Sequence, residues 1–183
     1  MKYKRSGCEG VTLFELLVVV LIAALLPTLA LPAFSAILDS VRLGAATQTF
    51  FHHLALARSE AITRNAHVVL CKSDTGKNCS QAGGWEQGWI VFHDANNNAM
   101  VDAGEVILQR EQALAPSIRV AGNSHVQSYV SYTPIGKTSL TSGAFQAGTL
   151  TICGQSTART QARQIVISSS GRPRTQRVTV DQC

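Results

Sequence analysis

The side chains of this sequence that are best suited to chemistry are arginines near its C-terminus. The stretch contains Arg159, Arg163, Arg172, Arg174 and Arg177. A guanidinium group donates to two phosphate oxygens at once and stays charged at physiological pH. Pro173 biases the preceding residue toward extended backbone, and residues two apart on extended backbone project to the same side. Arg172 and Arg174, in the segment Gly171-Arg172-Pro173-Arg174, are therefore predicted to form a two-pronged phosphate clamp.

The charge distribution favours a polyanionic partner for this segment. The whole chain has a formal net charge of +5. Residues 112–183 hold seven basic side chains and one acidic side chain, a balance of +6, whereas residues 11–111 hold six basic and nine acidic side chains, a balance of −3. Such asymmetry is typical of a surface that attracts polyanions. Charge alone leaves a second interpretation open, a solvated hairpin turn whose arginines serve solubility.

The sequence also constrains how a nucleic acid would bind. No aromatic residue follows Phe145, so the arginine-rich segment itself offers no platform on which bases could stack. Binding is expected through phosphates, with little sequence preference, at micromolar or weaker affinity and with a steep loss of affinity as salt rises. Lys137, Arg159, Arg163 and Arg177 are secondary contact candidates.

Other reactive side chains predict no catalytic site, and we expect no cofactor and no metal. His67, His93 and His125 are scattered along the chain, and Ser168 to Ser170 fall in a predicted turn without an obvious base. An enzyme is therefore not expected.

One acidic segment has the spacing of a calcium loop. Its oxygen-bearing side chains are Asp94, Asn96, Asn98, Asp102 and Glu105. The sixth position holds Ala99, where such a loop has glycine, and the flanking residues resemble strands rather than helices. An Asx-rich hairpin turn is the favoured interpretation, and calcium binding is the alternative.

An apolar segment near the N-terminus is predicted to cross a membrane. Residues 11–36 follow a short basic leader, and a helix of these 26 residues would extend roughly 39 Å, enough for a bilayer core. Glu15 lies inside the segment, where a carboxylate is costly without a partner. Either Glu15 has a partner there, or it lies at headgroup level. Pro27 and Pro32 each remove a backbone donor, so a kink or a melted stretch is expected.

The rest of the chain is predicted to fold as an α+β domain. An amphipathic half-helix over residues 37–66 carries one apolar stripe, made of Leu43, Ala46, Phe50, Leu54, Ala57 and Ala61. After a stop at Asn65, β-rich runs follow at 68–71, 89–93, 106–109, 118–120, 129–133, 149–153, 163–168 and 178–180. One long helix followed by strands predicts a helix packed on antiparallel sheet, with a β-rich head over residues 67–183.

The cysteines indicate an oxidising compartment. A membrane anchor with a basic N-terminus places the head outside the cytoplasm, where disulfides persist. Beyond Cys8 in the leader, four cysteines permit three pairings. The sequence-local choice pairs neighbours along the chain, Cys71 with Cys79 and Cys153 with Cys183. Zinc binding is the rival interpretation, but no CxxC pair is present.

The N-terminal pattern resembles a known processing signal. Gly10, followed by Val-Thr-Leu-x-Glu-Leu and a hydrophobic helix, is similar to the class III signal of type IV pilins and type II secretion pseudopilins. The resemblance implies that prepilin peptidase removes residues 1–10 and methylates Val11, and that Glu15 meets the terminal amine of a neighbouring subunit. It further implies that residues 11–36 span the inner membrane before assembly, with the head in the periplasm, and form the filament core afterwards.

The C-terminal pattern resembles a motif of one branch of that family. Gly171-Arg172-Pro173-Arg174 is similar to the GRxR motif of FimT-type minor pilins, and the wider family, which includes FimU and GspH, is similar over essentially the whole chain. The resemblance implies a pilin-like fold, other major and minor pilins as partners, a place at the pilus tip, and binding of extracellular DNA for uptake in natural transformation. The alternative is a structural minor pilin or pseudopilin that primes assembly, whose arginines contact a neighbouring subunit.

Overall fold

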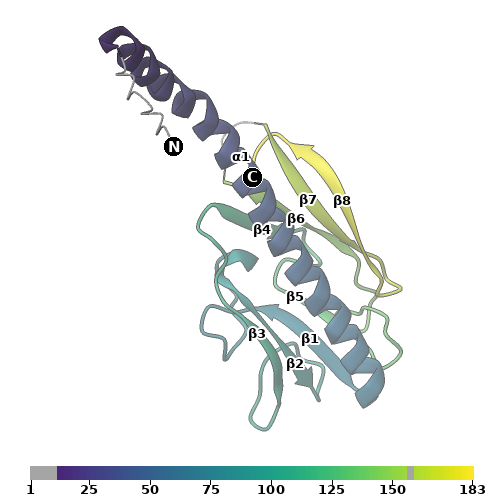
Figure 1. The fold of residues 1–183 in the computed structure, drawn as a ribbon. Coiled ribbons are helices and arrows are strands. Elements are labelled where there is room, and N and C mark those ends of the chain that lie inside the picture. Colours follow the sequence, from purple (N-terminus) through teal and green to yellow (C-terminus); the bar gives the residue numbers. More distant parts are fainter. Residues whose placement is uncertain (1–11, 156–158) are drawn as a thin grey trace, which may run out of the picture. The chain divides into compact units, whose positions relative to one another are not determined.

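The computed structural model describes residues 12–155 and 159–183, without the side chains of residues 26–33, 35 and 36. It divides into two compact units, Met1–Ser40 and Val41–Cys183. The elements follow the order of one long helix, α1, and eight strands, with a short 3-10 helix, η1 (Trp85–Gln87), after the first strand (Figure 1). The α+β fold is as predicted, a long N-terminal helix packed on antiparallel sheets.

Helix α1 runs from Leu13 to Arg64. Thr12 caps its first turn, because the Thr12 hydroxyl accepts the backbone N–H of Glu15 at 3.2 Å. The predicted stop is confirmed: Asn65 takes a left-handed conformation with φ of 51°, and Ala66 donates its N–H to the carbonyl of Ala61 at 3.2 Å. The helix continues through residues 27 and 32, so the melted stretch expected at the two prolines is absent.

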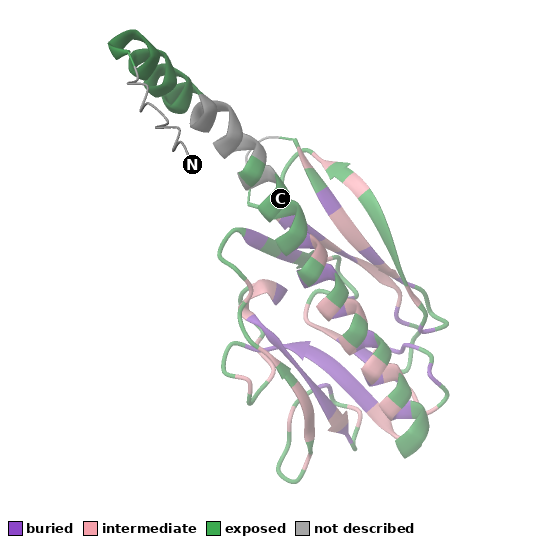
Figure 2. Ribbon diagram, viewed as in Figure 1, coloured by how far each residue is buried: buried purple, intermediate pink, exposed green. Residues whose placement is uncertain are grey.

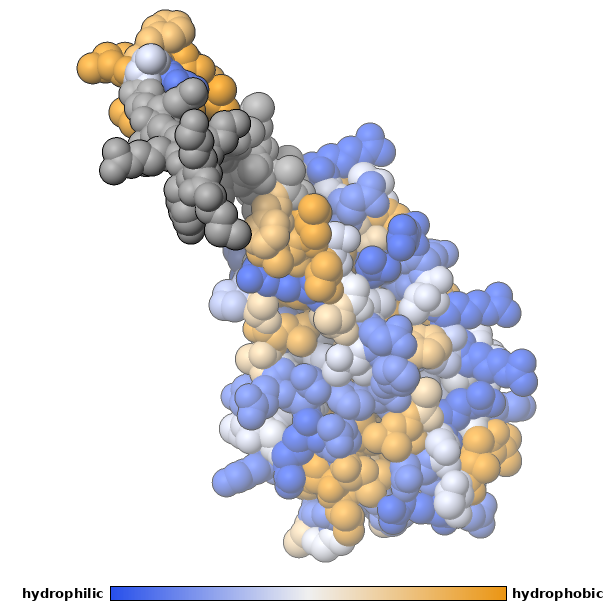
Figure 3. All heavy atoms as spheres, in the orientation of Figure 1, coloured by the Kyte–Doolittle hydropathy of each residue, from blue (hydrophilic) through white to orange (hydrophobic). Residues whose placement is uncertain are grey.

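The N-terminal unit displays apolar side chains along its described part. Leu13, Phe14 and Leu16 are exposed, as are most of the apolar residues that follow them up to Leu25, and Figure 3 shows this segment as largely hydrophobic. Within the residues described, no helix has an apolar stretch long enough to cross a membrane. The predicted span at 11–36 includes Val11 and the side chains at 26–33, 35 and 36, which lie outside the described part.

The predicted apolar stripe of α1 forms the core of the second unit. All six of its residues are buried, and Phe50, Leu54, Ala57 and Ala61 have no exposed surface. Phe50 packs against the rings of Trp85 and Trp89, with centroids 5.1 and 4.6 Å away. The same core takes in side chains from both sheets, so one face of the helix is covered by them (Figure 2).

Two four-stranded antiparallel sheets make up the head. The first has the order β3-β2-β1-β5, built from β1 (His67–Lys72), β2 (Trp89–Asp94), β3 (Ile107–Glu111) and β5 (Tyr129–Tyr132). The second has the order β4-β6-β7-β8, built from β4 (Ile118–Gly122), β6 (Gly148–Gly154), β7 (Thr160–Ile167) and β8 (Pro173–Val180). All eight predicted strands are present, but β8 begins five residues earlier than residue 178, where the sequence placed its start.

The outer face of the first sheet is covered. A second cluster buries Val69, Cys71, Ile90 and Phe92 under residues that include Ala99 of the 94–105 loop. The structure confirms the Asx-rich turn: the Asp94 carboxylate accepts the N–H groups of Asn98 at 3.1 Å and Ala99 at 2.8 Å. Glu105 likewise accepts two backbone N–H groups. Among the described residues, no group of three or more His, Cys, Asp or Glu is arranged to hold a metal ion.

Candidate nucleic-acid interface

The arginine-rich segment is a β-hairpin, which corrects the prediction of a C-terminal loop. Strands β7 and β8 pair from Thr160 opposite Val180 to Ile167 opposite Pro173, so only Arg172 of the clamp lies in the connecting turn. Two physical reasons explain the longer strand. Proline is tolerated as the first residue of an edge strand, and the following threonines and valines favour extended backbone.

The pleat of the sheet divides the arginines between two faces. Residues directly opposite each other on paired strands share a face. Arg174 lies opposite Val166, which lies opposite Thr149, on the face turned away from the core. Arg177 lies opposite Arg163, which lies opposite the buried core residue Ile152. The five arginines therefore do not form one cluster.

Arg163 and Arg159 are placed for other contacts. The Arg163 guanidinium lies against α1, with Nη2 3.6 Å from the point where a Cβ on Gly44 would stand, and the side chain is only partly exposed. Arg159 lies at the far end of the hairpin from Arg172 and is 3.7 Å from the carboxylate of Asp181. Arg177 is exposed because β8 is the edge strand. Arg172 and Arg174 thus remain the leading candidates.

A buried glycine fixes the turn that carries Arg172. Gly171 has φ of 76°, and a Cβ on it would stand 2.0 Å from the carbonyl oxygen of Gly136. That carbonyl also accepts the Nε–H of Arg58 on α1 at 2.9 Å. Gly171 closes the turn by donating its N–H to Ser168 at 2.9 Å. The turn is therefore held against the loop after β5 and against the helix.

Lys137 joins this site through its neighbours. Thr138 donates its hydroxyl to the carbonyl of Ser168 at 3.1 Å and its N–H to that of Ser169 at 3.4 Å. Lys137 follows Gly136 directly and is exposed. Arg58 and Gly136 were missed as positioning residues. Arg58 was recognisable only as a basic residue off the apolar stripe, since its partner lies far away in sequence.

The electrostatics of the site favour anions. Arg172, Arg174 and Lys137 are exposed, and no carboxylate among the described residues lies within ion-pair distance of them. Hydrophilic side chains gather over β7 and β8 (Figure 3). On the outward face, Gln176 donates to Gln164 at 2.8 Å, and Gln164 donates to Thr151 at 3.2 Å. This face is open and polar, in contrast to the covered outer face of the first sheet.

The chain matches a known protein family. The model of the type II transport protein GspH family matches residues 46–171. The chain belongs to the GspH family. This is a family of type II transport proteins, which are structural subunits rather than enzymes. The match ends at Gly171, so Arg172 and the whole of the hairpin's second strand, with Arg174, lie beyond it.

Solved structures agree with this fold. The type IV minor pilin FimU of Pseudomonas aeruginosa superposes with a TM-score of 0.57 at 18% identity, covering 79% of this chain and 97% of that chain. The minor pseudopilin EpsH of the Vibrio cholerae type 2 secretion system gives a TM-score of 0.50 at 10% identity, covering 74% of this chain and 96% of that chain. No curated protein sequence matches the chain significantly.

Of the residues predicted to act in processing and assembly of this GspH-family chain, the structure describes only Glu15. Gly10, Val11 and the predicted leader at residues 1–10 lie outside the described residues. Glu15 is exposed in the first turn of α1, where a carboxylate is favourable toward the helix dipole. The Thr12-x-x-Glu15 spacing is also that of a capping box, a signal that sequence reasoning overlooked.

Both predicted disulfides are present. Cys71 joins Cys79, and Cys153 joins Cys183, with Cα atoms 5.6 and 5.9 Å apart. The second bond fastens the last residue of the chain to β6. It therefore closes the end of the hairpin that lies opposite the Gly171 turn.

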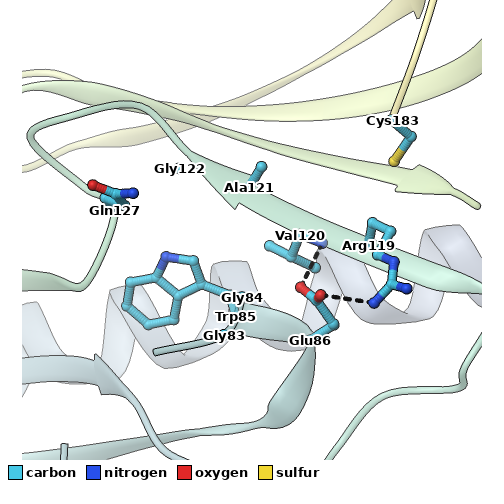
Figure 4. Close-up of a pocket in the computed structure, with 10 residues that line it drawn as sticks. All are labelled: Gly83, Gly84, Trp85, Glu86, Arg119, Val120, Ala121, Gly122, Gln127 and Cys183. Atoms are coloured by element: carbon cyan, nitrogen blue, oxygen red, sulfur yellow. Dashed lines mark hydrogen bonds and ion pairs between the residues drawn. The ribbon is translucent and has the colours of Figure 1, made fainter. Parts of the chain in front are cut away.

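A pocket beside β4 has its charges internally satisfied. It has a volume of about 280 Å³ and is lined by residues that include Trp85, Gln127 and Cys183 (Figure 4). The Glu86 carboxylate accepts the N–H of Val120 at 3.1 Å and pairs with Arg119 at 3.0 Å. Glu86 thus covers the open edge of β4 and neutralises Arg119, which takes no part in the basic interface.

Proposed function

We propose that this minor pilin binds extracellular DNA through the phosphates, with Arg172 and Arg174 as the main contacts and Lys137 beside them. Arg177 is a weaker contact. Arg163 packs against α1 and Arg159 pairs with Asp181, so these two contribute to the fold more than to DNA binding. In this proposal the chain is inserted in the inner membrane before assembly, is processed at Gly10 and Val11, uses Glu15 in assembly, and lies at the pilus tip when DNA is taken up for natural transformation.

One observation carries the proposal. Basic side chains stand exposed at a turn fixed by Gly171, without a carboxylate partner among the described residues. A fixed turn lowers the ordering cost of binding, and a guanidinium without a protein partner keeps its donors for phosphate oxygens. A turn whose arginines served only the fold would be expected to pair them, as Arg119 is paired with Glu86.

A gel shift tests the proposal. A chain lacking residues 1–38 keeps the whole compact unit Val41–Cys183 with its own core. We expect it to retard duplex DNA at low salt and to lose retention as salt rises. The double variant Arg172→Ala/Arg174→Ala should bind at least about tenfold more weakly, because it loses two phosphate contacts.

A charge-matched control separates local contacts from net charge. Arg64→Ala/Lys77→Ala removes the same two charges from exposed positions on the helix end and on the first sheet's side of the head. This control should retain most of the affinity. Equal retention of DNA by the clamp variant and the unmodified chain would refute the proposal and leave the structural alternative, in which the arginines contact a neighbouring subunit.

A further inference from the structure

Phe145 is a large apolar side chain left in solvent. It is 72% exposed and lies in the segment between β5 and β6. It pairs with Ser139 through an isolated antiparallel bridge. A single exposed apolar residue is ordinary on a protein surface, so its position relative to the basic turn decides whether it has a role.

Hydrogen bonds bring Phe145 to the Gly171 turn. Its neighbour Gln146 accepts the Thr138 hydroxyl at 2.6 Å through its backbone carbonyl, and the same hydroxyl also lies 3.1 Å from the Ser168 carbonyl. Thr138 is therefore the bridge between the two segments. The chain around Phe145 lies beside the start of the turn, although Arg172 is distant in sequence.

Phe145 lies just before the strand that shares a face with Arg174. Phe145 is exposed, and Gln146 after it is fully buried. Strand β6 begins at Gly148, and its residues Leu150 and Ile152 are fully buried, so Thr149 faces outward. Thr149 shares its outward row with Val166 and Arg174. Since β6 and β8 are separated only by β7, Thr149 and Arg174 are about 10 Å apart across the sheet, and Phe145 precedes Thr149 by four residues.

The residue next to Phe145 is held by three hydrogen bonds of its side chain. The Gln146 side chain accepts the N–H of Ser131 at 2.9 Å and donates to the carbonyls of His125 and Tyr129 at 2.7 and 2.9 Å. These contacts fix the backbone next to Phe145. An aromatic ring on fixed backbone loses little entropy when a ligand covers it.

We infer that Phe145 is a stacking site for an unpaired base, and that the interface prefers single-stranded DNA. This inference rests on the proposed function. The phosphates of a strand are held by Arg172 and Arg174 while one base a few nucleotides along covers the Phe145 ring. A duplex offers no such base, because its bases are stacked on each other. The surface thus supplies the aromatic platform that the arginine-rich segment lacks in its own sequence.

Fluorescence anisotropy with three probes tests the inference on the chain lacking residues 1–38. The probes are an oligothymidine of about 12 nucleotides, within the range of known single-strand sites, an abasic strand of equal length, and a duplex. Phe145→Ala should weaken oligothymidine binding roughly 5- to 150-fold, the value of one stacked base, and leave abasic and duplex binding unchanged. Phe145→Leu should behave like the alanine variant, and Phe145→Trp should retain binding.

Two further measurements guard against a purely structural effect. Ile135→Ala, which removes another exposed apolar side chain from the loop next to Gly136, should change none of the three affinities. In the Phe145→Trp chain, oligothymidine should quench the fluorescence of the indole at position 145, because a base stacks on it. Trp85 and Trp89 are fully buried, so the change in fluorescence can be assigned to position 145.

The outcomes separate this inference from the proposed function. Unchanged oligothymidine binding by Phe145→Ala, or an equal loss for all three probes, would overturn the stacking site while leaving the phosphate clamp intact. If the unmodified chain binds none of the probes, the proposed function itself fails, and the stacking site fails with it. Phe145 would then be available for contact with a neighbouring pilin.

Discussion

Gly171 sets the direction in which Arg172 leaves the turn. Its left-handed backbone and its contact with the Gly136 carbonyl leave no room for a side chain. The same carbonyl is held by Arg58, which links the turn to α1. The side chains of Arg172 and Arg174 are exposed and are not packed in this way. The shape of the interface therefore depends on Gly171, and its charge depends on the two arginines.

Substituting Gly171 tests this dependence. Gly171→Ala should lower the free energy of unfolding by about 2–4 kcal/mol, because the new Cβ meets backbone in a left-handed conformation. The matched control is Gly143→Ala, which also has positive φ but nothing within 4 Å, and which should cost only about 1 kcal/mol. Urea unfolding measures both values. Equal losses for the two variants would contradict the packing described for the turn.

His53 gives the head a pH dependence that can be measured. Its Nδ1 accepts the indole N–H of Trp89 at 2.9 Å, and burial lowers the pKa of His53 from its usual 6.5. The unfolded chain therefore takes up a proton below about pH 6.5 that the folded chain does not. The contribution of His53 to the free energy of unfolding is complete above that pH and is lost as the pH falls toward the folded pKa.

The variant His53→Asn keeps an acceptor for Trp89 but does not titrate. We expect the free energy of unfolding to fall less steeply from about pH 7 to pH 5 in this variant than in the unmodified chain. Chemical denaturation at a series of pH values gives the comparison. Parallel pH profiles would show that His53 does not contribute.

At the scale of elements, the β7–β8 hairpin is fastened at both ends by different means. Gly171 packs against the β5–β6 loop at the turn, and the Cys153–Cys183 bond fastens the opposite end. The edge strand β8 is mostly exposed, so these two attachments replace the burial that holds inner strands. The disulfide should matter for stability and little for the local geometry of the clamp.

Removing the two disulfides separately tests their roles. Cys153→Ala/Cys183→Ala opens a link between residues 30 apart, and Cys71→Ala/Cys79→Ala a link between residues 8 apart. The loop-entropy model predicts losses of about 3.5 and about 2.5 kcal/mol. Urea unfolding under non-reducing conditions measures them. DNA affinity of the folded Cys153→Ala/Cys183→Ala chain should be unchanged, and a large drop would mean that the clamp depends on the far end of the hairpin.

Patterns within single elements were predictable from sequence, whereas contacts between distant segments were not. The spacing of Leu43 to Ala61 predicted the buried helix face, and the eight β-rich runs predicted the strands. The extra length of β8 was missed because a proline and two arginines, which are more typical of a loop, occupy it, although an edge strand accepts them. The grouping of Phe145, Lys137 and Arg172 arises from hydrogen bonds through Thr138, which no local pattern encodes.

At the scale of the whole molecule, the two sheets differ in what covers their outer faces. The 94–105 loop and the Cys71–Cys79 loop close the first sheet, while the second leaves an open polar face that carries Arg174. The acidic side chains lie mainly in residues 11–111 and the basic excess in residues 112–183. A polyanion is therefore attracted to the second sheet and its hairpin rather than to the molecule as a whole.

The salt dependence of DNA binding tests the phosphate clamp most directly. The logarithm of the association constant for duplex DNA should fall linearly with the logarithm of salt concentration, and Arg172→Ala/Arg174→Ala should reduce that slope by about 1.8, or 0.9 for each lost phosphate contact. Arg64→Ala/Lys77→Ala should keep the original slope. An unchanged slope in the clamp variant would contradict the phosphate clamp, because Arg172 and Arg174 would then neutralise no phosphates.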